Sequence, residues 1–151
     1  MPEEKKEKIL IVEDDKSLRE MYQLRLSING YDVIEGGDGE EGLDLAIKEK
    51  PDLILLDIMM PKMSGMDVLD ILKSTPETKD IPVIVLTALT EENVKAKGLV
   101  YGAEDYLVKS QTMPGQVVEK IEGILSKKKG DNGTSGGEAG GTATGGNSET
   151  F

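Results

Sequence analysis

The amino-acid sequence predicts an α/β fold in which helices cover both faces of a parallel β-sheet. Short aliphatic runs alternate along the chain with segments of helical periodicity. Three of these runs, at residues 9–12, 53–56 and 82–86, are almost entirely apolar, as is typical of parallel strands buried on both faces. Parallel neighbours must be joined by a crossover, which the intervening helices supply. At 151 residues, the chain has room for one domain of this kind.

The first half of the chain is expected to contain two strand–helix units. A buried strand at 9–12 precedes a helix that the Asn29-Gly30 pair ends. A weaker strand at 32–35 precedes a second helix at 40–49. The residues that helical spacing places on the first helix stripe are Leu18, Met21, Tyr22, Arg25 and Leu26, and those expected to face inward on the second helix are Leu43, Ala46 and Ile47.

The second half is expected to contain three further strand–helix units. Each strand is a short run rich in aliphatic or aromatic residues, and each helix follows directly. Pro114 stands at the start of the last helix, where a missing backbone N–H is tolerated. In order, the strands are expected at 53–56, 82–86 and 105–108, and the helices at 64–72, 91–100 and 114–128.

The two ends of the chain differ from the middle in composition. Residues 1–7 are mostly Glu and Lys, so they are expected to form a short N-terminal extension and not a secretory signal. Eight of the 22 residues at 130–151 are Gly, and this composition buries too little apolar surface to fold. We therefore expect a folded domain at 8–128 and a disordered tail at 129–151.

Composition also excludes several classes of function. The chain has no cysteine and no histidine, which removes disulfides, thiolate metal sites, Ser-His triads and most zinc sites. The net charge of −11 argues against a direct nucleic-acid partner. No apolar run approaches the roughly 20 residues that span a membrane. We expect a cytoplasmic protein whose chemistry rests on carboxylates, hydroxyls, lysine and a bound metal ion.

Groups suited to phosphate or metal follow four of the five expected strands. They are Glu13 and Asp14, Asp57, Thr87, and Lys109. Because ligands of such sheets bind at the carboxyl ends of the strands, these groups are expected to gather in one site. Clustered carboxylates repel one another, and a hard dication such as Mg²⁺ relieves that repulsion. A lysine and such a cation neutralise a transferring phosphoryl group, while a carboxylate can act as the nucleophile.

Taken together, these motifs resemble the receiver domain of two-component response regulators over roughly residues 7–128. The resemblance, to the stand-alone single-domain type, implies a flavodoxin-like, doubly wound (βα)₅ fold with sheet order 2-1-3-4-5. It also implies the function of a phosphorylation-activated signalling switch. The motifs that carry the resemblance are Ile-Leu-Ile-Val-Glu13-Asp14-Asp15, Asp57-Ile-Met-Met-Pro61-Lys-Met-Ser-Gly65, Val-Leu-Thr87-Ala88 and Gly102-Ala103-Glu-Asp-Tyr106-Leu-Val-Lys109.

The resemblance implies that Asp57 is the phospho-acceptor and part of a site for Mg²⁺ or Mn²⁺. Asp14 and Asp57 would bind the metal directly, and Glu13 would bind it through water. The backbone carbonyl of Met59 would be a further ligand. Asp15 is expected instead to cap the first helix or to face water.

The resemblance also assigns the residues that would sense the phosphoryl group. Lys109, the hydroxyl of Thr87 and the backbone of Ala88 would contact it. Thr87 and Tyr106 would form a coupled switch pair, in which the hydroxyl moves toward the phosphate and the ring turns inward behind it.

Partners follow from the same resemblance. The phosphoryl donor would be a sensor histidine kinase or a histidine phosphotransfer protein. The output would be contact with a downstream protein, through the face built from the helix at 91–100, the strand at 105–108 and the helix at 114–128. The chain would be a monomer or a phosphorylation-dependent homodimer. Its only catalysis would be its own phosphorylation and dephosphorylation, and the tail cannot fold an output domain.

Four residues refine this interpretation. Ser110 follows Lys109 where the family usually has proline in a cis peptide, so a trans bond is expected here. Met59 and Leu89 stand at the positions that line the path of the hydrolytic water in the family, and their apolar side chains predict slow self-dephosphorylation. Gly98 lies in the expected fourth helix, where it costs about 1 kcal/mol relative to alanine and predicts an easily shifted helix.

Other functions remain open at this point. A degenerate receiver would act only as a binding module. Such a protein would lack the acceptor, the acidic pair or the lysine, and all of them are present here. A Mg²⁺-dependent phosphatase of the haloacid-dehalogenase type also uses an aspartyl nucleophile, but it needs a second carboxylate two residues on, where Met59 stands. A flavin-binding flavodoxin would need a hydroxyl-rich loop after the first strand, where acidic residues stand instead.

Overall fold

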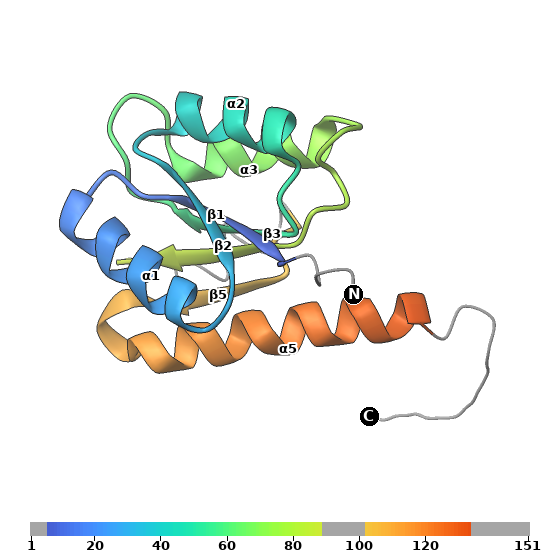
Figure 1. Cartoon of the computed structure of the whole chain (residues 1–151). Helices are drawn as coiled ribbons and strands as arrows, with labels where there is room; N and C mark the ends of the chain where they lie inside the picture. The colour runs from blue at the N-terminus through green and yellow to red at the C-terminus, as the bar shows by residue number, and fades with distance from the viewer. Residues whose placement is uncertain (1–5, 89–101, 134–151) are drawn as a thin grey trace. The chain divides into compact units, whose positions relative to one another are not determined.

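A computed structural model describes residues 6–88 and 102–133, with backbone alone at 128–133. The chain divides into two compact units, Met1–Ile121 and Glu122–Phe151. The sheet and every residue of the site described below belong to the first unit. Figure 1 shows the course of the chain.

Five parallel strands form a single sheet in the order β2-β1-β3-β4-β5. This order confirms the expected flavodoxin-like topology. Each strand is within one or two residues of its expected range, because short runs of β-branched and aliphatic residues between turn residues predict strands. The strands are β1 (Lys8–Val12), β2 (Asp32–Gly36), β3 (Leu53–Asp57), β4 (Val83–Thr87) and β5 (Asp105–Val108).

The register brings the carboxyl ends of the strands to one edge of the sheet. Val12 is paired with Leu56, Asp57 with Leu86, and Thr87 with Val108. The residues that follow these pairs along the chain therefore leave the sheet side by side.

The helices begin where polar residues cap them. The side chains of Asp15, Asp38 and Ser64 accept hydrogen bonds from the backbone N–H groups of Leu18, Glu41 and Asp67 at the starts of three helices. The expected cap at Asp15 is confirmed. The helices described are α1 (Lys16–Ile28), α2 (Gly39–Glu49), α3 (Gly65–Ser74), the short 3₁₀ helix η2 (Lys109–Gln111) and α5 (Pro114–Gly133).

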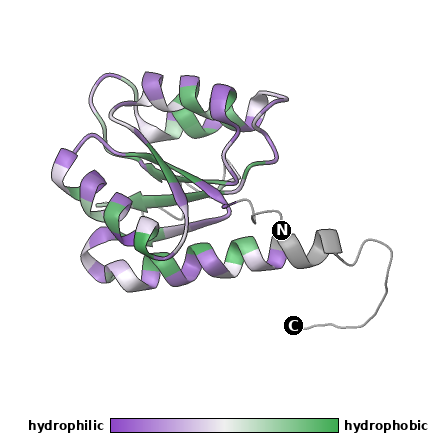
Figure 2. Ribbon diagram, viewed as in Figure 1, coloured by the Kyte–Doolittle hydropathy of each residue, from purple (hydrophilic) through white to green (hydrophobic). Residues whose placement is uncertain are grey.

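Helices cover both faces of the sheet. In Figure 1, α2 and α3 lie on one side of the strands and α1 on the other. Alternate residues of β1 serve the two faces: Leu10 and Val12 belong to the cluster under α2 and α3, whereas Ile9 and Ile11 are buried on the side of α1. Figure 2 shows the hydrophobic colouring concentrated along the strands.

One close approach fixes α2 on the sheet. A Cβ atom added to Gly42 would lie 2.8 Å from both methyl groups of Val12, and one added to Gly36 would lie 3.2 Å from the Cα of Gly42. The absence of side chains at both glycines lets the helix rest against β1 and β2, beside the edge where the polar groups collect.

Two expectations about the helices are wrong. Ile47 is exposed, with 43% of its surface accessible, because the inner stripe of α2 contains the buried Gly42 and Ala46 and the half-buried Leu43 and Leu45 instead. The last helix does not end at Lys128 but continues to Gly133. Lys127, Lys128 and Lys129 favour continuation past the expected end, because lysine is a good helix former.

Other expectations lie outside the described residues. These are the helix at 91–100, with Gly98, the side chain of Leu89, and residues 134–151 of the expected tail. Within the described parts of the chain, no helix is both long enough and apolar enough to cross a membrane.

Candidate functional site

Three carboxylates converge at the carboxyl edge of the sheet. Glu13 and Asp14 follow β1, and Asp57 ends β3, so the neighbouring strands deliver all three. One oxygen from each lies within 4.8 Å of the others. Glu13 and Asp57 are buried, whereas Asp14 is exposed. The structure thus brings together the acidic residues that the sequence singled out.

Lys109 reaches into this acidic cluster from the end of β5. Its Nζ lies 3.0 Å from Oε1 of Glu13 and 3.4 Å from Oδ2 of Asp57. No peptide bond among the described residues is cis, so the Lys109–Ser110 bond is trans, as Ser110 predicted. The trans bond does not keep the ammonium group from the carboxylates, since Lys109 contacts both Glu13 and Asp57.

The shared site perturbs the protonation of its members. Burial, followed by the charge of Glu13, raises the pKa of Asp57 from 3.8 to about 7, although the ammonium group of Lys109 opposes the shift. Burial alone would lower the pKa of Lys109, but its bonds and attraction to Glu13 and Asp57 prevail and raise it. Burial also raises the pKa of the nearby Tyr22 hydroxyl.

Three carboxylates with one lysine suit a hard dication. Two negative charges remain uncompensated when all three acids are ionised, and the oxygens lie close enough to share one ion. Carboxylate oxygen is the donor that Mg²⁺ and Mn²⁺ prefer. The donor set therefore fits the metal that the sequence implied.

The loop after β3 is held tightly against Asp57. The backbone N–H of Met59 donates to Oδ1 of Asp57 over 3.2 Å, and that of Gly65 donates to the carbonyl of Ile58 over 2.8 Å. A Cβ on Gly65 would collide with the carbonyl oxygen of Asp57. The side chain of Met59 is 54% exposed. Gly65 was part of the recognised motif, but only the folded chain reveals why glycine is required.

The proposed switch residues lie on the two neighbouring strands. Thr87 is fully buried at the end of β4, and the adjacent Ala88 is exposed. Tyr106 is half-buried and packs against the hydrophobic cluster under α2 and α3. Tyr106 is paired with Val85 and Val108 with Thr87, so Thr87 and Tyr106 are two register positions apart on adjacent strands.

Arg19 also belongs to the site, and the sequence did not identify it. Its Nη1 donates to the backbone carbonyl of Glu13 over 2.7 Å, and its Nε donates to Oε1 of Glu35 over 3.1 Å. Arg19 is in the first turns of α1, and Glu35 is on β2, next to β1. An arginine one turn into the helix after an acidic strand end, with an acid on the neighbouring strand, would have been the available signal.

Comparisons with known proteins agree with this arrangement. The family model of the response regulator receiver domain matches residues 9–122. The alkaline phosphatase synthesis transcriptional regulatory protein PhoP of Bacillus subtilis is 42% identical over 122 residues, which cover 81% of this chain and 50% of the relative. The probable transcriptional regulator ycf27 of Porphyridium aerugineum is 43% identical, over 81% of this chain and 49% of its own length. The chain thus spans about half the length of these curated relatives.

Solved structures give the same result. The chemotaxis protein CheY4 of Vibrio cholerae superposes with a TM-score of 0.74 at 31% identity, covering 80% of this chain and 99% of the other. A CheY-like response regulator receiver domain protein of Methanospirillum hungatei JF-1 superposes with a TM-score of 0.77 at 27% identity, covering 84% and 99%. By sequence, sheet order and the match over residues 9–122, this chain belongs to the response regulator receiver domain family, and its function is that of a phosphorylation-activated signalling switch.

Proposed function

We propose that Asp57 is the phosphoryl acceptor of this switch and that a divalent cation, Mg²⁺ or Mn²⁺, is required for the transfer. The observation that carries the proposal is the Asp57 carboxylate itself. It is buried at the end of β3, with Lys109 at 3.4 Å and two further acids within 4.8 Å. Burying a carboxylate beside other acids costs folding free energy. Such groups occur mainly at functional sites, and a role in phosphoryl transfer accounts for this one.

The two oxygens of Asp57 have different partners. In the unphosphorylated state, Oδ1 accepts from the N–H of Met59 and Oδ2 faces Lys109. One carboxylate oxygen attacks phosphorus, the bond from phosphorus to the histidine nitrogen of the donor breaks, and its electron pair returns to the imidazole ring. A dication would be held by Asp14, Asp57 and the carbonyl of Met59, with Glu13 acting through water, and it would neutralise charge on the transferring group. Lys109 would neutralise charge on the transferred group.

The donor, in this proposal, is a sensor histidine kinase or a histidine phosphotransfer protein in the cytoplasm. The phosphoryl group would be read by Lys109, Thr87 and the backbone of Ala88, and Tyr106 would follow Thr87. The output would be contact with a downstream protein through the face that contains β5 and α5, by a monomer or a phosphorylation-dependent homodimer.

Intact-mass measurement after incubation with acetyl phosphate tests the proposal. The wild-type chain should gain one phosphoryl group with Mg²⁺ and none with a chelator. Asp57→Asn should gain none under either condition. Asp44→Asn, which neutralises an exposed acid on α2, is the matched control and should be phosphorylated like the wild type. No gain in the wild type would favour the binding module, and a gain that survives Asp57→Asn would place the acceptor elsewhere.

A further inference from the structure

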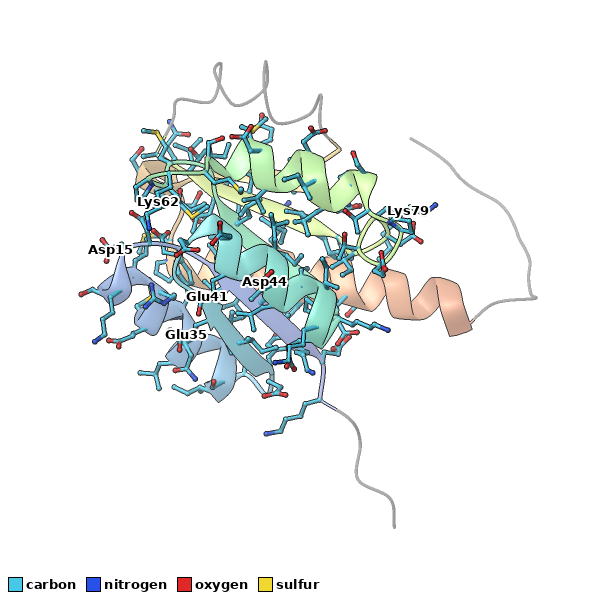
Figure 3. All side chains as sticks on the ribbon, turned by 90° about the horizontal axis from the view of Figure 1, so that it is seen from above. Asp15, Glu35, Glu41, Asp44, Lys62 and Lys79 are labelled. Carbon is cyan, nitrogen blue, oxygen red and sulfur yellow. The ribbon has the colours of Figure 1, made fainter. Side chains whose placement is uncertain are left out.

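Arg19 ties together three segments that border the acidic cluster. It lies on α1, its Nη1 donates to the carbonyl of Glu13 over 2.7 Å, and its Nε donates to Glu35 on β2 over 3.1 Å. The arginine side chain is 17% exposed and that of Glu35 is 34% exposed. A planar guanidinium with two fixed donors, largely shielded from water, constrains geometry better than a flexible surface ion pair does. In Figure 3, Glu35 is labelled on β2 and Asp15 at the start of α1.

The backbone of Glu13 is consequently held from both sides. Its N–H donates to the carbonyl of Gly36 over 3.0 Å, while its own carbonyl accepts from Arg19. The side chain of Glu13 is held as well, because its Oε2 accepts a hydrogen bond from the N–H of Asp15 over 3.1 Å. The turn from β1 into α1 is thus fastened at the residues before and after Asp14.

Asp14 is the one acid of the cluster that depends on its backbone alone. Its carboxylate is exposed, and no side chain among the described residues pairs with it. Glu13 and Asp57, in contrast, are buried and contact Lys109. The peptide that Arg19 holds therefore fixes the backbone position from which the Asp14 carboxylate extends.

We infer that Arg19 is a positioning residue of the metal site, acting through the Glu13 carbonyl and oriented by Glu35. This inference rests on the proposed metal-dependent function. Arg19 does not contact the metal in this role. It fixes the peptide from which the Glu13 and Asp14 carboxylates extend, so that both point to one place.

The sign of its effect separates this role from a simple charge effect. A positive charge beside a dication site disfavours the dication, so removing it should strengthen metal binding. Loss of a positioning residue should instead weaken metal binding, because the ligands are then free to spread. Outer partners of metal ligands typically contribute about 10-fold or more to affinity.

Binding of Mn²⁺, followed by the loss of the free-ion signal in electron paramagnetic resonance, tests the inference directly. Arg19→Gln should raise the dissociation constant about 10-fold. Arg19→Lys keeps the charge but cannot hold both partners in a fixed fork, so it should give an intermediate value. Glu35→Gln should weaken binding as well, and its effect should largely vanish in the Arg19→Gln background, since Glu35 acts through Arg19.

A matched control lies at the amino end of β1, the strand that Glu13 follows. Lys8 and Glu49 form an ion pair of 3.2 Å with exposures of 28% and 36%, close to those of the Arg19–Glu35 pair. Lys8→Gln should leave the dissociation constant unchanged, because this pair touches no residue of the cluster. A thermal melt of each variant reports folding, and if Arg19→Gln does not fold, the comparison of Glu35→Gln with Lys8→Gln decides.

Acetyl-phosphate kinetics add a second readout. For Arg19→Gln, the Mg²⁺ concentration that gives half the maximal rate should rise about as much as the dissociation constant, while the rate at saturating Mg²⁺ stays near that of the wild type. Unchanged or tighter Mn²⁺ binding in Arg19→Gln would overturn the inference. If the wild type takes no phosphoryl group, the proposed function fails, but the Mn²⁺ measurement still decides the role of Arg19.

Discussion

The charged groups at the two ends of β1 differ in burial and in how far their charges are compensated. At the amino end, Lys8 pairs with Glu49, and its backbone N–H donates to Asp52 over 2.7 Å. At the carboxyl end, Glu13 and Asp57 are buried with Asp14 beside them, and Lys109 is the cation that contacts them. The Lys8–Glu49 pair is balanced and half-exposed. The arrangement at the carboxyl end is unbalanced and buried, and it raises the pKa of Asp57 to about 7. The charges at the amino end need no explanation beyond stability. The buried acids at the carboxyl end cost folding free energy, and a bound ligand or a reaction would account for that cost.

The largest contrast is expected from removing one lysine at each end. Lys109→Met should lower the rate of phosphorylation by acetyl phosphate about 100-fold, because a charge that stabilises the transferring group is lost. Lys8→Met should leave the rate within about twofold, since Lys8 lies at the opposite edge of the sheet. Rates from intact mass at saturating Mg²⁺ provide the measurement. Equal rates for both variants would mean that Lys109 has only a structural role.

A substitution in the loop after β3 should damage the carboxyl edge through packing alone. Gly65→Ala places a Cβ against the carbonyl oxygen of Asp57, so the free energy of unfolding should fall by about 2–4 kcal/mol. Urea denaturation measures this change. Gly123→Ala is the control, because a Cβ there meets no described atom within 4 Å, and it should stabilise α5 by about 0.5–1 kcal/mol. A neutral result at Gly65 would show that the loop can move away from Asp57.

Neutralising one acid at each end should shift stability in opposite directions. In metal-free buffer at pH 8, Asp57→Asn should raise the free energy of unfolding on the order of 1 kcal/mol after solvent screening. Asp52→Asn should lower it by about 0.5 kcal/mol, because the bond to the Lys8 N–H weakens. Thermal melts of the two variants and the wild type provide the comparison.

The same argument fixes a dependence on pH. The pKa of Asp57 is about 7 when folded and 3.8 as a free group, so between these values the folded state binds more protons. Metal-free wild type should lose stability as the pH rises through this window, and Asp57→Asn should lack that component. A wild-type profile that rises with pH throughout this interval would contradict the burial of an unbalanced charge.

The smallest effect on stability is expected at the Lys8–Glu49 ion pair. Glu49→Gln should lower the free energy of unfolding by less than about 0.5 kcal/mol, since half-exposed ion pairs contribute little. It should leave phosphorylation and Mn²⁺ binding unchanged. A loss above about 1 kcal/mol would show that the amino end carries more of the stability than its exposure suggests.

Most of the fold and the central site could be predicted from sequence because both depend on short-range patterns. The apolar runs at β1, β3 and β4 identify buried strands, and parallel pairing then brings Glu13, Asp57 and Lys109 to the same edge of the sheet. Arg19 could not be predicted, because its partners are a backbone carbonyl and an acid brought near by pairing of β1 with β2. Ile47 was placed wrongly because helical spacing defines a stripe but not its centre, which the two glycine contacts determine.

The contact between Gly42 and Val12 has a consequence for how this sequence can diverge. A side chain at Gly42 would overlap both methyl groups of Val12, while Gly36 leaves room for the helix backbone itself. A relative with alanine at position 42 is therefore expected to carry a smaller residue at position 12, and the smaller residue must arise first. The two positions, 30 residues apart in the chain, should change in that order and not independently.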